Sequence, residues 1–140
     1  MNTMKRIKIE KDIKVFYIQA KSFPDGVMEA FQKMHSLIEF PPKRRNFGIS
    51  RSENGEIVYR VAAEELNEGD LKKYNFAEFV IPSGDYIRIE IKDFRKDLSL
   101  IKVAFDQLLT LPDVDPSGYC IEEYKGKEDV FCMIRLQNGK

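Results

Sequence analysis

The sequence predicts an α+β domain in which one strand-helix-strand-strand unit occurs twice. Two stretches carry apolar residues at helical spacing, and each is followed by a pair of strand-like segments. Several landmarks in the first half recur 71 positions later. We expect two repeats related by a pseudo-two-fold axis, with both helices on one face of a mainly antiparallel sheet.

The first repeat is predicted over about residues 5–64. Residues 7–20 are rich in β-branched and aromatic residues and end at a Pro24-Asp25-Gly26 break, which predicts a strand and a turn. Asn54-Gly55 lies between the strand-like segments 47–51 and 57–63 and is typical of a tight hairpin turn. Between these features, apolar residues recur at helical spacing up to the Pro41-Pro42 pair: Val27, Ala30, Phe31, Met34 and Ile38.

The second repeat is predicted over about residues 75–137. Segments 76–81 and 86–91 are strand-like on either side of a Pro82-Ser83-Gly84 kink. A second hairpin is predicted over 119–124 and 130–136. A helical stripe that stops before Pro112 precedes this hairpin: Leu98, Ile101, Phe105, Leu108 and Leu109. The polar stretch 64–73 is interpreted as the connection between the repeats.

The repetition is visible as a constant offset between landmarks. The pairs are Phe23 with Phe94, Leu37 with Leu108, and Gly55 with Gly126, each 71 positions apart. The order and the spacing agree although few residues are identical. We therefore predict one domain, 1–140, built by duplication; 140 residues with 43% hydrophobic and 33% charged are suited to a single folded core.

The charge balance argues against two classes of partner. The chain has 23 Lys and Arg against 23 Asp and Glu, so no net positive field attracts nucleic acid or an anionic membrane. The cluster Lys43-Arg44-Arg45 is interpreted as a solvated loop that complements a helix end. The first eleven residues are punctuated by charge and lack the apolar stretch of a secretory signal, so we expect a cytoplasmic protein.

The residue types also argue against metal, cofactor and nucleophilic chemistry. The single histidine, His35, lies inside the first predicted helix, where a packing role is favoured over catalysis. Cys120 and Cys132 are too few for a zinc site, and we expect both to be reduced thiols. The eight glycines are isolated from one another, so no phosphate-binding or dinucleotide-binding loop is present. No catalytic residue, metal or cofactor is therefore predicted.

The strand over residues 118–124 carries the most informative pattern. Alternation places Cys120, Glu122 and Tyr124 on one face and Glu123 on the other, so the adjacent carboxylates have different surroundings. In segment 86–91 the isoleucines face the helix, which leaves Tyr86, Arg88 and Glu90 on the opposite face. We therefore expect the sheet to carry tyrosines and carboxylates on its non-helical face. The spacing alone leaves open an ordinary solvated face with cross-strand ion pairs.

Several short motifs, taken in order, resemble the GyrI-like effector-binding family. They are Ile81-Pro82-Ser83-Gly84-Asp85-Tyr86 at a strand start, a helix, Ser117-Gly118-Tyr119, and Ile121-Glu122-Glu123-Tyr124. The hairpin strand Ile57-Val58-Tyr59-Arg60-Val61 matches the order of the family upstream. The resemblance spans nearly the whole chain and implies two strand-helix-strand-strand repeats.

The resemblance also implies a ligand site, and we expect it in a pocket between the two repeats because pockets favour such junctions. In the family, a glutamate of the E-x-Y strand lies in an aromatic-lined pocket and receives hydrophobic cations. This role falls on Glu122, with Tyr124 beside it, Tyr86 from the glycine-tyrosine strand, and Tyr59. Many members carry a tryptophan near the end of the second helix, whereas this chain reads Leu108-Leu109-Thr110-Leu111 there.

Three functions are consistent with the resemblance. The favoured one is binding of hydrophobic, cationic small molecules by a stand-alone sensor or sequestering module, related to effector domains of bacterial multidrug-response transcription activators. A second is inhibition of a protein partner, as in the gyrase-inhibiting members. A third is hydrolysis of electrophilic cyclopropane-bearing compounds, with Glu122 activating water. Binding is ranked first because a buried carboxylate among aromatic rings suits an organic cation. Binding and hydrolysis need the same glutamate in the same pocket, so only turnover of an electrophilic substrate separates them.

Overall fold

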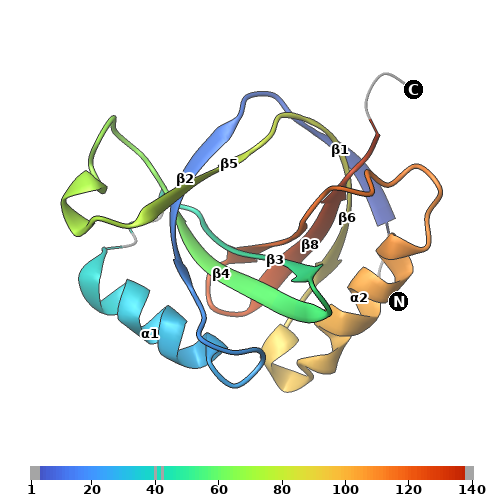
Figure 1. The fold of residues 1–140 in the computed structure, drawn as a ribbon. Coiled ribbons are helices and arrows are strands. Elements are labelled where there is room, and N and C mark those ends of the chain that lie inside the picture. The colour runs from blue at the N-terminus through green and yellow to red at the C-terminus, as the bar shows by residue number, and fades with distance from the viewer. Residues whose placement is uncertain (1–3, 40, 42, 138–140) are drawn as a thin grey trace. The chain divides into compact units, whose positions relative to one another are not determined.

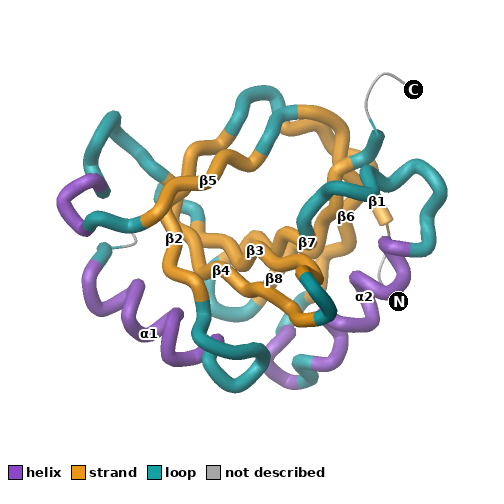
Figure 2. Tube along the Cα trace, in the orientation of Figure 1, coloured by secondary structure: helices purple, strands orange, loops and turns teal. Residues whose placement is uncertain are grey.

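The computed structural model describes residues 4–39, 41 and 43–137, and these form two compact units (Figure 1). Unit 2 is Asp12–Ile81, and unit 1 combines the described residues of Met1–Lys11 and Pro82–Lys140. Each unit has one α-helix and four antiparallel strands (Figure 2). The predicted α+β class is therefore confirmed.

Unit 2 contains the first helix and the first predicted hairpin. Its elements are β2 (Ile13–Gln19), α1 (Val27–Leu37), β3 (Asn46–Glu53), β4 (Glu56–Glu64), the short 3₁₀ helix η1 (Lys72–Tyr74) and β5 (Ala77–Ile81). The strands are ordered β3-β4-β2-β5, and Asn54 and Gly55 both have the positive φ that the tight turn between β3 and β4 requires. One face packs against α1 through Phe16, Val61, Ala63, Ala30 and Met34.

Unit 1 contains the second helix and the second hairpin. Its elements are β1 (Met4–Ile9), β6 (Gly84–Ile91), the 3₁₀ helix η2 (Phe94–Lys96), α2 (Ser99–Leu109), β7 (Cys120–Lys125) and β8 (Asp129–Arg135). The strands are ordered β1-β6-β8-β7. The core on the α2 side is formed by the buried residues Ile89, Ile91, Phe94, Ala104, Phe105, Leu108, Val130, Cys132 and Ile134.

The strand pairing repeats with the predicted offset. Ile18 of β2 is paired with Val61 of β4, and Ile89 of β6 is paired with Cys132 of β8, so both partners are displaced by 71. The two α-helices follow the same pattern to within one residue. The offset in the sequence thus corresponds to a repeated arrangement of strand, helix and hairpin.

The N-terminal strand differs from the prediction. Residues 7–20 were expected to form one strand, but the structure contains β1 and β2 with a break at residues 10–12. These three residues are Glu10, Lys11 and Asp12, and their charge disfavours continued burial in a sheet. β1 pairs with β6 and so belongs to unit 1, whereas β2 pairs with β4 and β5 in unit 2.

No helix in the described part of the chain has the length and apolarity needed to cross a membrane.

Candidate functional site

The structure places the four predicted ligand-binding residues in three different surroundings. Glu122 and Tyr124 lie together on β7, on the face of the unit 1 sheet that packs against α2. Tyr86 lies in β6 of the same unit but, by strand alternation, on the opposite face. Tyr59 lies in β4 of unit 2, within the core beneath α1. Glu122 and Tyr124 are therefore the pair that unit 1 brings into contact.

Glu122 is a buried acid. Its residue is 7% exposed, and among the residues that the structure describes it is the one charged residue that is buried. Its strand neighbours on the same face, Cys120 and Tyr124, pack against the α2 core, and Cys132 is paired directly opposite it on β8. The carboxylate thus sits at the α2 side of the sheet, where water has little access.

Tyr124 connects the carboxylate to an aromatic wall. Its phenol donates a short hydrogen bond to Oε1 of Glu122. Its ring packs at a tilt against Phe94 of η2, with 5.6 Å between the ring centroids. Glu122 is therefore in contact with a tyrosine whose ring packs against a phenylalanine.

The pKa values of the two neighbouring cysteine thiols reflect the burial and the charge of this site. Burial first, and then the negative charge of Glu122, raise the pKa of Cys120 to about 11. Burial, Glu122 and Cys120, in that order, raise the pKa of Cys132 as well. Both cysteines are free thiols in the structure. The α2 side of β7 and β8 is therefore a poorly hydrated region in which further negative charge is disfavoured.

Tyr86 has a structural partner of its own. It is fully buried, and its phenol donates a 2.6 Å hydrogen bond to the carbonyl of Pro82. Gly84, in the same motif, has a φ of +135°, and an added Cβ would lie 2.9 Å from Nη2 of Arg135. This part of the motif therefore shapes the kink that leads into β6.

Tyr59 belongs to a second aromatic cluster, in unit 2. It is 3% exposed and stacks on Phe23 with 5.7 Å between centroids, while Phe31 of α1 lies 6.3 Å away. The position equivalent to Glu122 is Gly48, because Gly48 pairs with Val61 as Glu122 pairs with Cys132. The cluster in unit 2 therefore lacks the carboxylate that distinguishes unit 1.

Phe94 is a site residue that the sequence analysis did not select. Phe23 and Phe94 were recognised only as landmarks separated by 71 positions. In the structure each packs against a tyrosine, Phe23 against Tyr59 and Phe94 against Tyr124. The offset of 71 relates the two phenylalanines but not the two tyrosines, which are 65 positions apart, so the offset alone would not have selected Phe94.

The face of unit 1 away from α2 has a different chemistry. Arg88 lies over the ring of Phe131 at 4.0 Å from its centroid, and Lys125 lies over the same ring at 5.0 Å. Glu90 and Glu123 are paired with Phe131 from either side. Cations already cover this aromatic ring, so this face offers less attraction to a further cation than the α2 side does.

Metal binding finds no support in the same region. Within residues 4–39, 41 and 43–137, no group of three His, Cys, Asp or Glu side chains is arranged to hold a metal ion.

Comparison with known proteins gives matches at the level of structure. No protein-family model matches the chain, and no curated protein matches its sequence. An integron cassette protein from the mobile metagenome of Vibrio cholerae, VCH_CASS2, is 12% identical, with a TM-score of 0.66 over 96% of this chain and 95% of that one. The fold expected from the resemblance is confirmed.

Two further solved structures carry informative descriptions. SAV2435 bound to tetraphenylphosphonium is 11% identical, with a TM-score of 0.61 over 99% of this chain and 94% of that one. A hydrolase from Listeria innocua is 10% identical, with a TM-score of 0.59 over 96% and 91%. These neighbours are consistent with a GyrI-like domain, and at such identities they establish the fold alone.

Proposed function

We propose that the protein binds hydrophobic, cationic small molecules at Glu122, as a sensor or sequestering module. The observation that carries this proposal is the buried carboxylate of Glu122, hydrogen-bonded by Tyr124 on the α2 side of unit 1. A structural neighbour described as bound to tetraphenylphosphonium, a hydrophobic cation, supports the same ligand class.

The physical argument starts from the cost of burying a charge. An ionised carboxylate removed from water loses several kcal/mol of solvation, of which partners in the protein return a part. An organic cation next to Glu122 returns more of it by Coulomb attraction and does not need to be strongly hydrated itself. Contacts with the faces of Tyr124 and Phe94 add roughly 0.5 to 2 kcal/mol each. Lipophilic cations therefore suit this site better than ammonium-bearing metabolites do.

Burial also sets how a ligand reaches the carboxylate. With 7% of the residue exposed, Glu122 is accessible to a bulky cation only when the side chains packed around it move apart. Opening exposes part of the apolar core, and the bound ligand then replaces the contacts that were lost. We expect binding to be slower than diffusion because this rearrangement is required.

The proposal assigns a different role to each of the four predicted residues. Glu122 is the counter-ion and Tyr124 is an aromatic wall, joined by Phe94. Tyr86 contributes by fixing the start of β6 through its bond to Pro82. A contribution of Tyr59 to the same ligand, and the location of the pocket between the repeats, stay predictions.

The test is a calorimetric titration of tetraphenylphosphonium against three proteins. Glu122→Gln keeps the shape of the side chain and removes its charge, so affinity should fall by about 1 to 3 kcal/mol, which is roughly 5- to 150-fold. Glu123→Gln removes the adjacent charge, on the opposite face of β7, and should change affinity less than twofold. The neutral analogue triphenylphosphine oxide should bind all three proteins alike. Equal losses in both variants, or no loss in Glu122→Gln, would refute the assignment.

The Glu122–Tyr124 hydrogen bond also favours a second candidate, hydrolysis of an electrophilic cyclopropane. Glu122 would take a proton from a water molecule whose oxygen attacks the electrophilic ring carbon, and the water adds across the carbon–carbon bond that breaks. One structural neighbour is described as a hydrolase. Turnover of such a compound by the wild type, lost in Glu122→Gln, distinguishes hydrolysis from binding.

A further inference from the structure

Unit 2 contains a cavity that is unrelated to Glu122. It lies between the C-terminal end of α1 and the segment that includes η1, and its volume is about 790 Å³. This volume is within the range of about 300 to 1,000 Å³ that is usual for small-molecule sites. The described residues at its wall include both acids and bases, together with apolar side chains.

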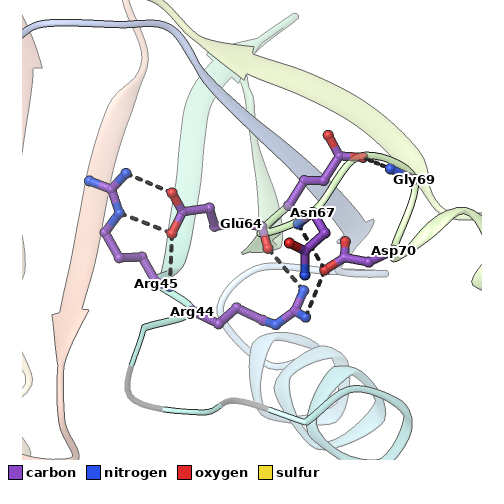
Figure 3. A network of polar contacts seen from close by, with 7 residues as sticks. Arg44, Arg45, Glu64, Asn67, Gly69 and Asp70 are labelled. Carbon is purple, nitrogen blue, oxygen red and sulfur yellow. Dashed lines mark hydrogen bonds and ion pairs between the residues drawn. The ribbon is translucent and has the colours of Figure 1, made fainter.

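The centre of the polar wall is an ion pair between Arg44 and Asp70 (Figure 3). Nη2 of Arg44 donates to Oδ2 of Asp70 at 3.0 Å, and Nη1 donates to the carbonyl of Glu64 at 3.0 Å. The backbone N–H of Asn67 donates to the same Oδ2 at 3.3 Å. The two side chains are only 11% and 20% exposed, so this network holds a fixed cation and a fixed anion at the cavity.

Two buried polar atoms of this ion pair have no hydrogen-bond partner among the residues that the structure describes. Within the described part of the chain, Nε of Arg44 and Oδ1 of Asp70 are buried and have no hydrogen-bond partner. Buried donors and acceptors are almost always paired in folded proteins. Both atoms are covered in this structure, so a ligand reaches them only when the two side chains shift; Nε is then a donor that suits a carboxylate, and Oδ1 is an acceptor that suits an ammonium group.

The other charged side chains at the cavity wall also include one cation and one anion. Lys73 adds a second cation and Glu39 a second anion. The last carbonyl groups of α1 face the same end and carry partial negative charge. Incomplete hydration lowers the pKa of His35, so this wall residue is less readily protonated than an ordinary histidine. A ligand with a single charge would therefore meet repulsion as well as attraction.

The apolar part of the wall completes the description. Leu71 is 2% exposed and Ile38 is 4% exposed, so both belong to the core and present a fixed apolar surface. The ring of Tyr74 stacks on Phe76 with 5.6 Å between centroids and has Lys73 Nζ at 5.2 Å. A ligand with a small apolar body can lie here while its charged groups reach the polar wall.

We propose that this cavity binds a small zwitterion, namely an α-amino acid with an apolar side chain. Its carboxylate lies toward Arg44 and Lys73, and its ammonium group lies toward Asp70, Glu39 and the end of α1. The apolar side chain lies on Leu71 and Tyr74. The site is separate from Glu122 and does not depend on the proposed cation binding.

The experiment is an NMR titration of the ¹⁵N-labelled full chain with the twenty L-amino acids at millimolar concentration. An apolar member such as L-leucine should shift the amide signals of Lys73, Tyr74 and the end of α1. L-Leucinamide, which lacks the carboxylate, and 4-methylpentanoate, which lacks the ammonium group, should each bind at least tenfold more weakly. If no amino acid shifts these signals, or if both single-charge analogues bind as well as L-leucine, the proposal is wrong.

Variants make the test specific. Lys73→Gln changes an exposed side chain and should lower the affinity for L-leucine at least fivefold without unfolding the protein. Lys72→Gln, at the neighbouring exposed position outside the wall, is the matched control and should change it less than twofold. Equal effects of the two variants would overturn the proposal. Glu122→Gln should leave L-leucine binding unchanged, so failure here and failure of cation binding are distinguishable.

Discussion

The hydrogen bond from Tyr124 to Glu122 leads to a quantitative prediction about stability. Tyr124→Phe removes the phenol oxygen but keeps the ring and its packing on Phe94. Glu122 then loses a donor at a position where little water can replace it. Hydrogen bonds to charged groups contribute about 1.5 to 3 kcal/mol, so we expect the free energy of unfolding to fall by that amount.

Tyr86→Phe is the matched control. It removes a buried phenol of the same sheet, but the acceptor is the neutral carbonyl of Pro82. A neutral hydrogen bond contributes about 0.5 to 1.5 kcal/mol, so the loss should be smaller than for Tyr124→Phe. In a Glu122→Gln background the acceptor is neutral too, and Tyr124→Phe should then cost about 1 kcal/mol or less.

Urea unfolding at pH 7, analysed as a two-state transition, measures these differences. A loss of 2 kcal/mol corresponds to roughly 5 to 10 °C in the midpoint of thermal unfolding for a chain of this size. The reasoning is refuted if Tyr124→Phe costs no more than Tyr86→Phe, or if its cost is the same with Glu and with Gln at position 122.

Three further predictions concern other parts of unit 1. The pKa of Cys120 is raised from 9.0 to about 11, so its thiol favours folding below pH 9. The free energy of unfolding should fall by up to about 3 kcal/mol between pH 9 and pH 11. Cys120→Ala should flatten this decline when urea unfolding is measured at several pH values. Gly84→Ala should lower the free energy of unfolding by about 1 to 3 kcal/mol, because the backbone has a φ of +135° and the new Cβ would meet Arg135; an unchanged midpoint would contradict this. The backbone N–H and hydroxyl of Ser117 donate to Asp115 and hold its pKa below 3.8. The free energy of unfolding should therefore decline as the pH falls from 3.8 through the lowered pKa. In Asp115→Asn this decline at acid pH should be shallower.

Much of the fold was accessible from the sequence because the local signals agree with one another. The predicted helix starting at Val27 is observed as Val27–Leu37, and Asn54-Gly55 forms the expected turn. The split of the first strand was missed because Ile7, Ile9 and Ile13 suit one strand or two equally well. Only the long-range pairing of β1 with β6 decides between these arrangements, and pairing partners are not encoded in local periodicity.

The candidate site was predictable in part. Alternation along β7 correctly separated Glu122 from Glu123, and the burial of one of them followed from that separation. The expectation that tyrosines and carboxylates lie on the non-helical face holds for Tyr86 but is wrong for Glu122 and Tyr124, which lie on the α2 face. That assignment needs the strand register, in which Glu122 is opposite Cys132 and Tyr86 is opposite Arg135. Register depends on pairing across the sheet and is invisible in a single strand.

A crystal structure of the protein with tetraphenylphosphonium would test the central proposal most directly. The account predicts that the phosphonium lies within about 6 Å of the Glu122 carboxylate, the range in which opposite charges interact strongly. At least one phenyl ring should contact Tyr124 or Phe94, and the side chains packed around Glu122 should have moved. A cation bound elsewhere, with Glu122 still buried and hydrogen-bonded to Tyr124, would contradict the account.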